Sequence, residues 1–525
     1  MIPVPSEQRA HRRLTVIAFL FAAASVLWSG FSIRHWLREQ QAERREQLGR
    51  WSREPEPGEE PVLHPTNAVA AFQHRRDTVG LTDAAALFST TNVWTLHLRF
   101  TPDQWEEMEP RLIEPLDRDR RGNAVFGLRN PRASRNGLAG VRGLEFDWVE
   151  AALDFEDRVL PRVGVRYKGN GTYLRSQRQL KRPLKVDLNR FDKSQSVAGR
   201  KTLNLANLVT DDSCLHDVLA YEVYRAAGVP SPRTAFARVF LTTNREPARH
   251  LGLYALVENP DQEFAAETLG TRDGVMFKPV TPRLFADLGN DWSDYEGIYD
   301  PKNKPSAAQT RRVIEFAQLV SHADDATFAA RVAEFLDLDE FSRFLAVTVL
   351  LSSYDSFLAN GQNFYLWLAP EPQRFLFLPW DLDNAWGRFG GASAGERAAA
   401  SIRHPWVGEH RLLERLFAVP AFRERYFATL ERLLDEVFVP ERLHRRVDEL
   451  AALVRPLVAE ESRRKHERFE EAVTRTTARN DEEDGRGFGR NRPPHPLKWF
   501  ITERAKSVRS QLAGESEGVI PARWR

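Results

Sequence analysis

Four polar side chains that surround one apolar stretch could bind a metal ion together. Asp355 ends the segment LDEFSRFLAVTVLLSSYD, and Asn363 follows in the turn SFLANGQN. Two short apolar runs, FYLWL and RFLFLPW, then lead to Asp381 and Asp383 in PWDLDNAWG. Because a hairpin of this length returns the chain to its start, these side chains could converge at one end. Three carboxylates and an amide suit a hard cation such as Mg²⁺, with phosphate oxygens at its other positions. An acidic surface turn is the alternative for the Asp-Leu-Asp run taken alone.

Lysine usage indicates a second chemical feature. The chain has eleven lysines, none before Lys168, and five of them fall in one short region: Lys168, Lys181, Lys185, Lys193 and Lys201. Where a plain cation suffices this chain uses arginine, so lysine is expected where a compact, flexible ammonium group is needed, as at a phosphate. Gly169 and Gly171, in KGNGT, would allow a close backbone approach to an anion. Chance clustering on a solvated surface, with glycines that serve only a turn, is the alternative.

A carboxylate on a predicted helix supplies a candidate partner for these lysines. Asp212 and Ser213 can cap a helix that runs to Ala227, and Glu222 lies inside its apolar stripe. A buried carboxylate must be paired or protonated, and Lys185 is a suitable partner. A local ion pair with Arg225, or a place at the exposed edge of the stripe, would explain Glu222 equally well. Asp217, on a neighbouring face, is the second candidate.

The elements that would position these residues change in type along the chain. Strands predominate from VWTLHLRF, near Val93, to about Gly270. A Thr-Pro-Asp helix start follows the first of them. Helices predominate from Ala307 to about Arg475, with segments expected at 309–322, 327–335, 338–353 and 440–468. A strand-rich half followed by a helix-rich half predicts an α+β protein with two lobes.

Composition excludes several classes of protein. The 525 residues exceed the usual span of one core, and 42% hydrophobic with 28% charged residues argues against wholesale disorder. The net charge of +2 does not predict a large uniform surface for nucleic acid, so no nucleic-acid partner is expected. The single cysteine, Cys214, excludes an intrachain disulfide framework and a cysteine zinc cluster.

The N-terminal region contains an apolar segment of membrane-spanning length. Leu14 to Ile33 carries no charged residue, and its 20 residues would span roughly 30 Å as a helix. We therefore expect a single-pass anchor, with a buried helix or a signal peptide as alternatives. Arginines on both sides leave the orientation open, although a short N-terminal tail favours a position of the large domain outside the cytoplasm.

The expected domain organisation follows from these changes in composition. It comprises a tail (1–13), a transmembrane anchor (14–33), a linker (34–90), a strand-rich lobe (91–270), a helix-rich lobe with the metal site (271–475), and a loop with a C-terminal helix (476–525).

Several of these stretches, taken in order, resemble the CotH-type (spore-coat protein H) kinases, which are atypical protein kinases. The resemblance runs from about Gly164 to Gly387 and includes GVRYKGNGTYL, KRPLKVDLNRF, KTLNLAN, LAYEVYRAAGVPSPR, GLYALVEN, DSFLANGQNFYLWL and FLPWDLDNAWG. It implies a bilobal kinase-like fold that transfers the γ-phosphoryl group of ATP to Ser or Thr of a protein substrate, with Mg²⁺ or Mn²⁺.

The resemblance also implies roles for individual residues. Asp355 matches the acid that orients the acceptor hydroxyl, while Asn363 and Asp381 match the metal ligands, with Asp383 beside them. Lys185 would contact the ATP phosphates and Glu222, or Asp217, would hold it. Lys181, Gly169, Gly171 and Glu258 would line the nucleotide site, Glu258 near the adenine. Gln362 departs from the family pattern, which usually has His before the asparagine.

Two other functions are compatible with the same residues. One is a kinase-like envelope or surface protein that binds without catalysis. The other is a metal-dependent glycosyltransferase, which would use the Asp-Leu-Asp run but would leave Asp355 and the lysine-bearing strands unexplained.

Overall fold

The computed structural model describes residues 83–115, 130–243, 248–390, 392–477 and 493–522. Two units are distinguished, of which the first comprises Met1–Glu54 with Gln177–Leu180 and is described only at 177–180, a stretch of turn and bend. The second unit comprises Pro55–Ser176 with Lys181–Arg525, and the remainder of the description concerns it. The predicted anchor, residues 14–33, lies outside the described residues.

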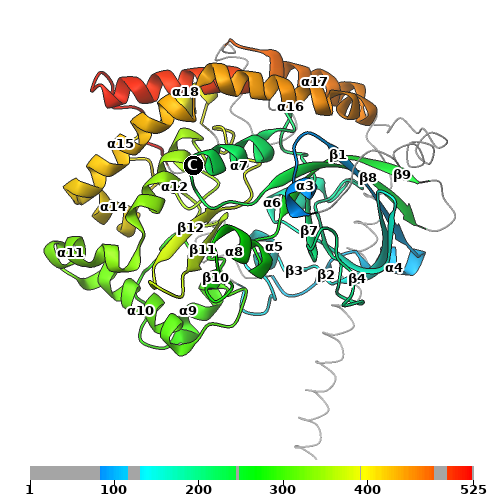
Figure 1. The fold of residues 1–525 in the computed structure, drawn as a ribbon, viewed down its shortest axis with the longest axis horizontal. Helices are drawn as coiled ribbons and strands as arrows, with labels where there is room; N and C mark the ends of the chain where they lie inside the picture. Colours follow the sequence, from blue (N-terminus) through cyan, green and yellow to red (C-terminus); the bar gives the residue numbers. More distant parts are fainter. Residues whose placement is uncertain (1–82, 116–129, 244–247, 391, 478–492, 523–525) are drawn as a thin grey trace, which may run out of the picture. The chain divides into compact units, whose positions relative to one another are not determined.

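Seven strands close into a barrel in the order β1-β4-β5-β6-β7-β9-β8 (Figure 1). Their side chains alternate between interior and exterior; in β4, for example, Val149, Ala151, Leu153 and Phe155 are buried. The strands are β1 (Val93–Phe100), β4 (Val149–Phe155), β5 (Arg158–Tyr167), β6 (Leu184–Asp187), β7 (Thr202–Ala206), β8 (Thr234–Thr243) and β9 (Arg249–Glu258).

One parallel pairing closes this barrel. β1 pairs antiparallel with β4, Leu96 opposite Phe155, and parallel with β8, Val93 opposite Phe236. All other neighbouring strands in the barrel are antiparallel. The predicted strand near Val93 is therefore present, and the predicted Thr-Pro-Asp helix start follows it. Thr101 and Gln104 form a capping box there, at the start of α4 (Pro102–Glu107).

A smaller sheet carries the hairpin expected from the sequence. β11 (Phe364–Leu368) and β12 (Phe375–Pro379) pair antiparallel, and β10 (Val275–Phe277) extends them on the β11 side. The backbone N–H of Trp380 donates to the carbonyl of Asn363 at 3.1 Å, so the two ends of the hairpin meet. Phenylalanine rings from this hairpin and from α12 (Leu338–Leu350) pack together, with Phe341 and Phe377 centroids 4.8 Å apart.

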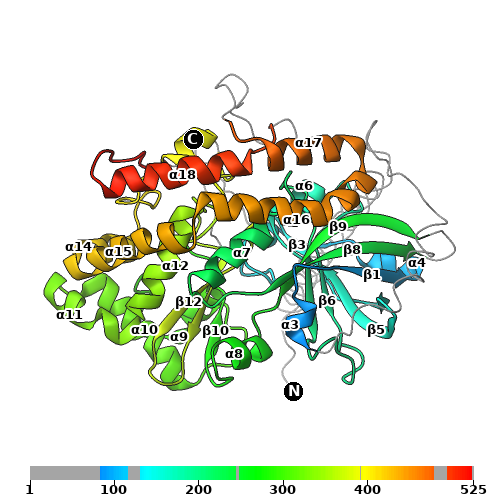
Figure 2. The same ribbon diagram turned by 45° about the horizontal axis from the view of Figure 1, so that its top comes forward.

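Helices form most of the remaining structure, and two of them pack against the barrel. α7 (His216–Ala226) follows β7, and α16 (Pro440–Glu461) packs on β9 (Figure 2). The predicted segment 440–468 is interrupted at Ser462, which caps α17 (Arg463–Thr474). The other elements of the described residues are α3 (Ala84–Leu87), β2 (Arg111–Leu112), α5 (Leu138–Val141), β3 (Leu144–Glu145), α6 (Gly171–Ser176), α8 (Gln262–Thr268), α9 (Trp292–Tyr299), α10 (Ala307–His322), α11 (Asp325–Phe335), α13 (Ala394–Ala398), α14 (Arg411–Ala418), α15 (Pro420–Glu436) and α18 (Leu497–Leu512).

The predicted fold class, a bilobal kinase-like α+β architecture preceded by a transmembrane helix, is wrong. The strand-rich half closes into a barrel through the β1–β8 pairing, and barrel and helices belong to one compact unit because α16 packs back on β9. Among the described helices, none is both long and apolar enough to cross a bilayer.

Candidate active site

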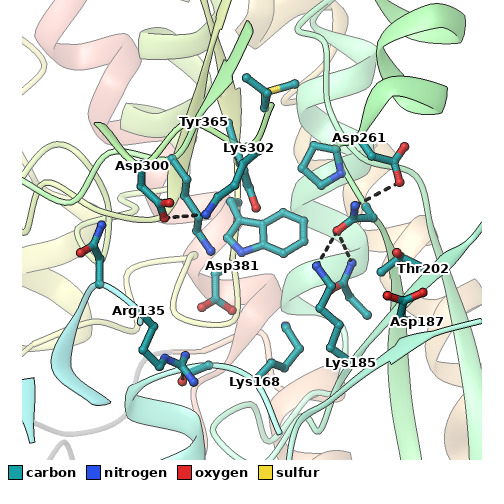
Figure 3. A pocket seen from close by; sticks show the side chains of 18 of the residues that line it. Arg135, Lys168, Lys185, Asp187, Thr202, Asp261, Asp300, Lys302, Tyr365 and Asp381 are labelled. Carbon is teal, nitrogen blue, oxygen red and sulfur yellow. Dashed lines mark hydrogen bonds and ion pairs between the residues drawn. The ribbon is translucent and has the colours of Figure 1, made fainter. Parts of the chain in front are cut away.

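A polar cavity of about 690 Å³ brings together side chains from the barrel and from the small sheet (Figure 3). The barrel contributes Lys185 on β6, and the turn after β5 contributes Lys168 and Gly169. Asn363 and Asp381 enter from the two ends of the β11–β12 hairpin. Segments more than 200 residues apart in sequence, as Lys168 and Asp381 are, therefore supply one pocket.

The cavity wall is rich in lysine. Five of the eleven lysines of the chain line it, namely Lys168, Lys185, Lys201, Lys278 and Lys302. Lys201 is paired with Glu263 at 2.8 Å and Lys302 with Asp300 at 2.5 Å. The other three have no carboxylate partner within ion-pair distance in the described structure, so the pocket presents ammonium groups that an anion can neutralise.

Lys185 and Lys278 are the two lysines of the cavity wall whose pKa values are lowered most clearly. The Lys185 Nζ donates to Asn259 Oδ1 at 3.1 Å, and burial, with Arg166 and Lys168 nearby, lowers the pKa of Lys185 to about 7. Burial and the neighbouring Lys302 lower the pKa of Lys278 to about 7 as well. Both groups would be held in the charged form by a bound anion.

The turn after β5 requires glycine at position 169, because its backbone conformation is left-handed there. Gly169 has φ +77°, and a Cβ there would lie 2.8 Å from Thr172 Oγ1. Its carbonyl accepts a hydrogen bond from Arg135 Nη2 at 2.8 Å, which fixes the turn against the cavity. Gly171 begins α6 and does not belong to the cavity wall.

Asp381 and Asn363 both adopt left-handed backbone conformations, with φ +56° and +61°. Asn and Asp tolerate this region better than other non-glycine residues, and such conformations often occur at functional sites. Asn363 Nδ2 donates to the Asp355 carbonyl at 2.8 Å, which leaves Oδ1 as the amide atom able to bind a cation. The backbone N–H of Asp381 donates to Tyr221 Oη at 3.1 Å.

Asp355 and Asp383 lie behind the cavity wall and are joined by an amide. Asn384 Nδ2 donates to Asp355 Oδ2 and to Asp383 Oδ1, both at 3.0 Å. Asn360 and Gln362 donate to Asp355 Oδ1, and Thr210 donates to Asp383 Oδ2 at 2.6 Å. Burial raises the pKa of both acids, and Asp381 raises that of Asp383 further.

Asp217 and Glu222, the two candidate acids of α7, lie in different surroundings. Asp217 Oδ1 accepts from the Leu382 backbone N–H at 2.9 Å; burial, followed by the charge of Asp381, raises the Asp217 pKa. Glu222 accepts two bonds from Arg446, at 2.8 and 2.9 Å, and one from Thr90. The expected pairing of Lys185 with Glu222 is thereby corrected, because Arg446 on α16 occupies both Glu222 oxygens.

Two further predicted nucleotide-site residues are engaged elsewhere. Lys181 pairs with Glu461 at 2.8 Å, at the end of α16. Glu258 is fully buried and accepts from Arg233, Nε donating at 3.0 Å. Neither side chain belongs to the cavity wall.

The residues present fit a divalent cation bound jointly by protein and phosphate. In the described parts of the chain no group of three or more His, Cys, Asp or Glu side chains is arranged to hold a metal ion. Asp381 and Asn363 nevertheless share the cavity with several ammonium groups. Magnesium commonly takes one or two carboxylates and completes its shell with phosphate oxygens and waters.

Sequence reasoning missed many residues of the cavity wall, among them three that matter for its chemistry. Lys278, Lys302 and Trp380 line it, although the first two belong to no recognisable motif. The scarcity of lysine was the signal that could have identified Lys278 and Lys302, because it applies to them as much as to Lys185.

Comparison with known proteins establishes the family. The model of the family described as "CotH kinase protein" matches residues 165–494, more than half of the sequence. This chain belongs to the CotH kinase family. It is 26% identical over 286 residues to "Inner spore coat protein H" of Bacillus subtilis (strain 168), covering 53% of this chain and 75% of the relative. It is also 25% identical over 262 residues to "Inner spore coat protein H-like protein" of the same organism, covering 49% and 68%.

The predicted location, a single-pass membrane protein with its catalytic domain outside the cytoplasm, is corrected by these findings. The relatives carry the names of spore coat proteins, and no described helix can span a membrane. The prediction rested on residues 14–33 alone, which lie outside the described structure.

Proposed function

We propose that this chain is an ATP-dependent protein kinase that phosphorylates Ser or Thr of a protein substrate with the help of a divalent cation. One observation carries the proposal: the cavity that contains Lys168, Lys185 and Lys278 also contains Asp381 and Asn363. A cluster of ammonium groups beside one carboxylate and one amide is what a triphosphate with a bound cation requires.

Each residue of the wall would have a definite part in this reaction. Lys185 and Lys168 would neutralise phosphate oxygens, and Asp381 with Asn363 Oδ1 would hold Mg²⁺ or Mn²⁺. When bound, the cation supplies positive charge to the phosphate oxygens as the bridging bond weakens. The acceptor oxygen bonds to the γ-phosphorus as the bond to the β,γ-bridging oxygen breaks, and ADP leaves.

Asp355 would act on the acceptor hydroxyl from just behind the wall. Its carboxylate receives three amide hydrogen bonds, from Asn360, Gln362 and Asn384, and of these donors Gln362 lines the cavity. Release of the Gln362 contact would leave Oδ1 bonded to Asn360 alone, with a lone pair to orient the hydroxyl and to accept its proton.

Asp355 lies behind the cavity wall and its carboxylate already accepts three hydrogen bonds, so an acceptor hydroxyl cannot reach it without a rearrangement. This favours a second candidate function, that of a family member that binds a nucleotide without transferring phosphate. The glycosyltransferase alternative lacks comparable support, because Asp383 is directed to Thr210 and Asn384 while Asp381 lines the cavity.

The test is phosphoryl transfer by the full-length protein. It is incubated with γ-labelled ATP, Mg²⁺ or Mn²⁺ and a generic protein acceptor, and phosphoserine and phosphothreonine are measured. Asp381→Asn and Lys185→Met should each reduce labelling at least a hundredfold, whereas Lys193→Met, at an exposed lysine, should leave it unchanged. Labelling by Asp381→Asn equal to that of the wild type would refute the proposal, and ATP binding without any transfer would support the non-catalytic candidate.

A further inference from the structure

Lys278 enters the cavity from the small sheet, on a backbone that is held firmly. It follows β10, and its N–H donates to the Tyr299 carbonyl at 2.9 Å. Pro279 comes next and restricts the backbone further. The lysine is therefore delivered to the cavity wall by a fixed segment.

Aromatic rings surround the ammonium group of Lys278. Its Nζ lies 5.4 Å from the ring centroids of both Tyr365 and Trp380. Lys168 approaches the same Trp380 ring, with its Nζ 5.6 Å from the centroid. Aromatic faces attract cations but cannot neutralise two of them at one ring, so these ammonium groups remain available to an anion.

The charges around Lys278 point to an anionic ligand rather than to an internal ion pair. Lys302, Lys168 and Lys185 act on it with the same sign, and Asp381 is the opposing carboxylate. Lys302 is satisfied by Asp300 (Figure 3), whereas no described carboxylate lies within ion-pair distance of Lys278 or Lys168. A half-buried lysine among like charges is costly unless a ligand supplies negative charge.

The position of Trp380 indicates which part of the ligand would bind here. Trp380 directly precedes Asp381, so an anion held over its ring lies next to the carboxylate proposed to hold the cation. We propose that Lys278, together with Lys168, binds the terminal phosphoryl group of the nucleotide. The inference rests on the proposed function and adds a phosphate-binding residue that the sequence motifs do not contain.

The experiment compares ATP, ADP and AMP binding to the full-length protein by titration calorimetry in Mg²⁺. Lys278→Met should weaken ATP binding at least tenfold, with AMP affinity changed less than twofold, because only the terminal phosphate loses a contact. Lys278→Arg should restore most of the ATP affinity, and Lys168→Met should show the same selectivity for ATP. Lys193→Met, the exposed control, should match the wild type for all three nucleotides.

The possible results separate the inference from the proposed function. Unchanged ratios of ATP, ADP and AMP affinity in Lys278→Met would overturn the role of Lys278 while leaving the kinase proposal intact. A wild-type protein that binds none of the three nucleotides would overturn both. If Lys278→Met does not fold, as judged by its melting temperature, Lys278→Arg and Lys168→Met still decide the matter, because both keep the aliphatic packing over Trp380.

Discussion

The carboxylate of Asp217 accepts a hydrogen bond from the backbone N–H of Leu382 at 2.9 Å. The preceding residue, Asp381, donates its own N–H to Tyr221 on the same helix at 3.1 Å. α7 thus holds two successive peptide groups, and these set the left-handed conformation of Asp381. Asp217 therefore positions Asp381, the proposed metal ligand, instead of forming an ion pair with Lys185.

Replacing Asp217 should show whether it acts by accepting the Leu382 hydrogen bond or by pairing its charge with a lysine. Asp217→Ala leaves the buried Leu382 N–H without an acceptor, which costs about 1–3 kcal/mol and loosens Asp381. Asp217→Asn keeps an acceptor oxygen. We therefore expect ATP affinity in Mg²⁺ to fall tenfold or more in Asp217→Ala and less than threefold in Asp217→Asn, measured by calorimetry. Equal defects in the two variants would indicate that the charge of Asp217 is what matters, as in a lysine–acid pair.

Glu222 should contribute to stability and not to nucleotide binding. Its bonds to Arg446 join α7 to α16 at a site that is about one quarter exposed. Solvent screens such a pair, so Glu222→Gln and Arg446→Gln should each lower the free energy of unfolding by about 1 kcal/mol. Urea denaturation of the two single variants and the double variant would give their coupling energy. A loss of ATP affinity in Glu222→Gln with unchanged stability would contradict this assignment.

Glu340 should make the protein less stable as the pH rises. It is buried on α12, where its Oε2 accepts from the Phe377 N–H and its Oε1 has no hydrogen-bond partner among the described residues. Burial raises the pKa of Glu340 from 4.5 to about 8. The folded state therefore binds one proton more than the unfolded state between these values, and stability falls as pH rises, by up to about 1.4 kcal/mol per pH unit.

Glu340→Gln removes this titration and should be more stable than the wild type by a margin that grows from pH 5 to pH 8. Urea unfolding at each pH measures the difference. Glu424→Gln, at an exposed glutamate, is the control and should show no such trend. A constant difference between Glu340→Gln and the wild type over this range would mean that Glu340 is ionised in the folded state.

Local patterns in the sequence predicted several elements correctly. The alternation of VWTLHLRF gave β1, the two apolar runs gave β11 and β12, and the predicted helices at 309–322, 327–335 and 338–353 match α10, α11 and α12 closely. These elements are determined by periodicity and capping, which act over a few residues. The hairpin also brings its two ends together, and Asn363 and Asp381 at these ends line the same cavity.

Contacts between distant segments were not predictable in this way. Nothing in the α7 sequence distinguishes Arg446, 224 residues further on, from Arg225 or Lys185 as the partner of Glu222. The same holds for the closure of the barrel and for Lys278, whose surroundings come from four separate segments. The break at Ser462 likewise reflects its capping of α17, which competes with a continuous helix.

The parallel pairing of β1 with β8 has a consequence for anyone who shortens this protein. The family match begins at residue 165, so a fragment cut there would lose β1, β4 and most of β5. Both β8 and the remainder of the sheet would then present unpaired backbone edges, which template self-association. The family match ends at residue 494, so a fragment cut at that end as well would lack α18. Arg504 on this helix donates to the Val349, Ala398 and Ala400 carbonyls. If such a fragment aggregated, the cause would be the missing strands and helix, and the result would say nothing about whether the protein transfers phosphate.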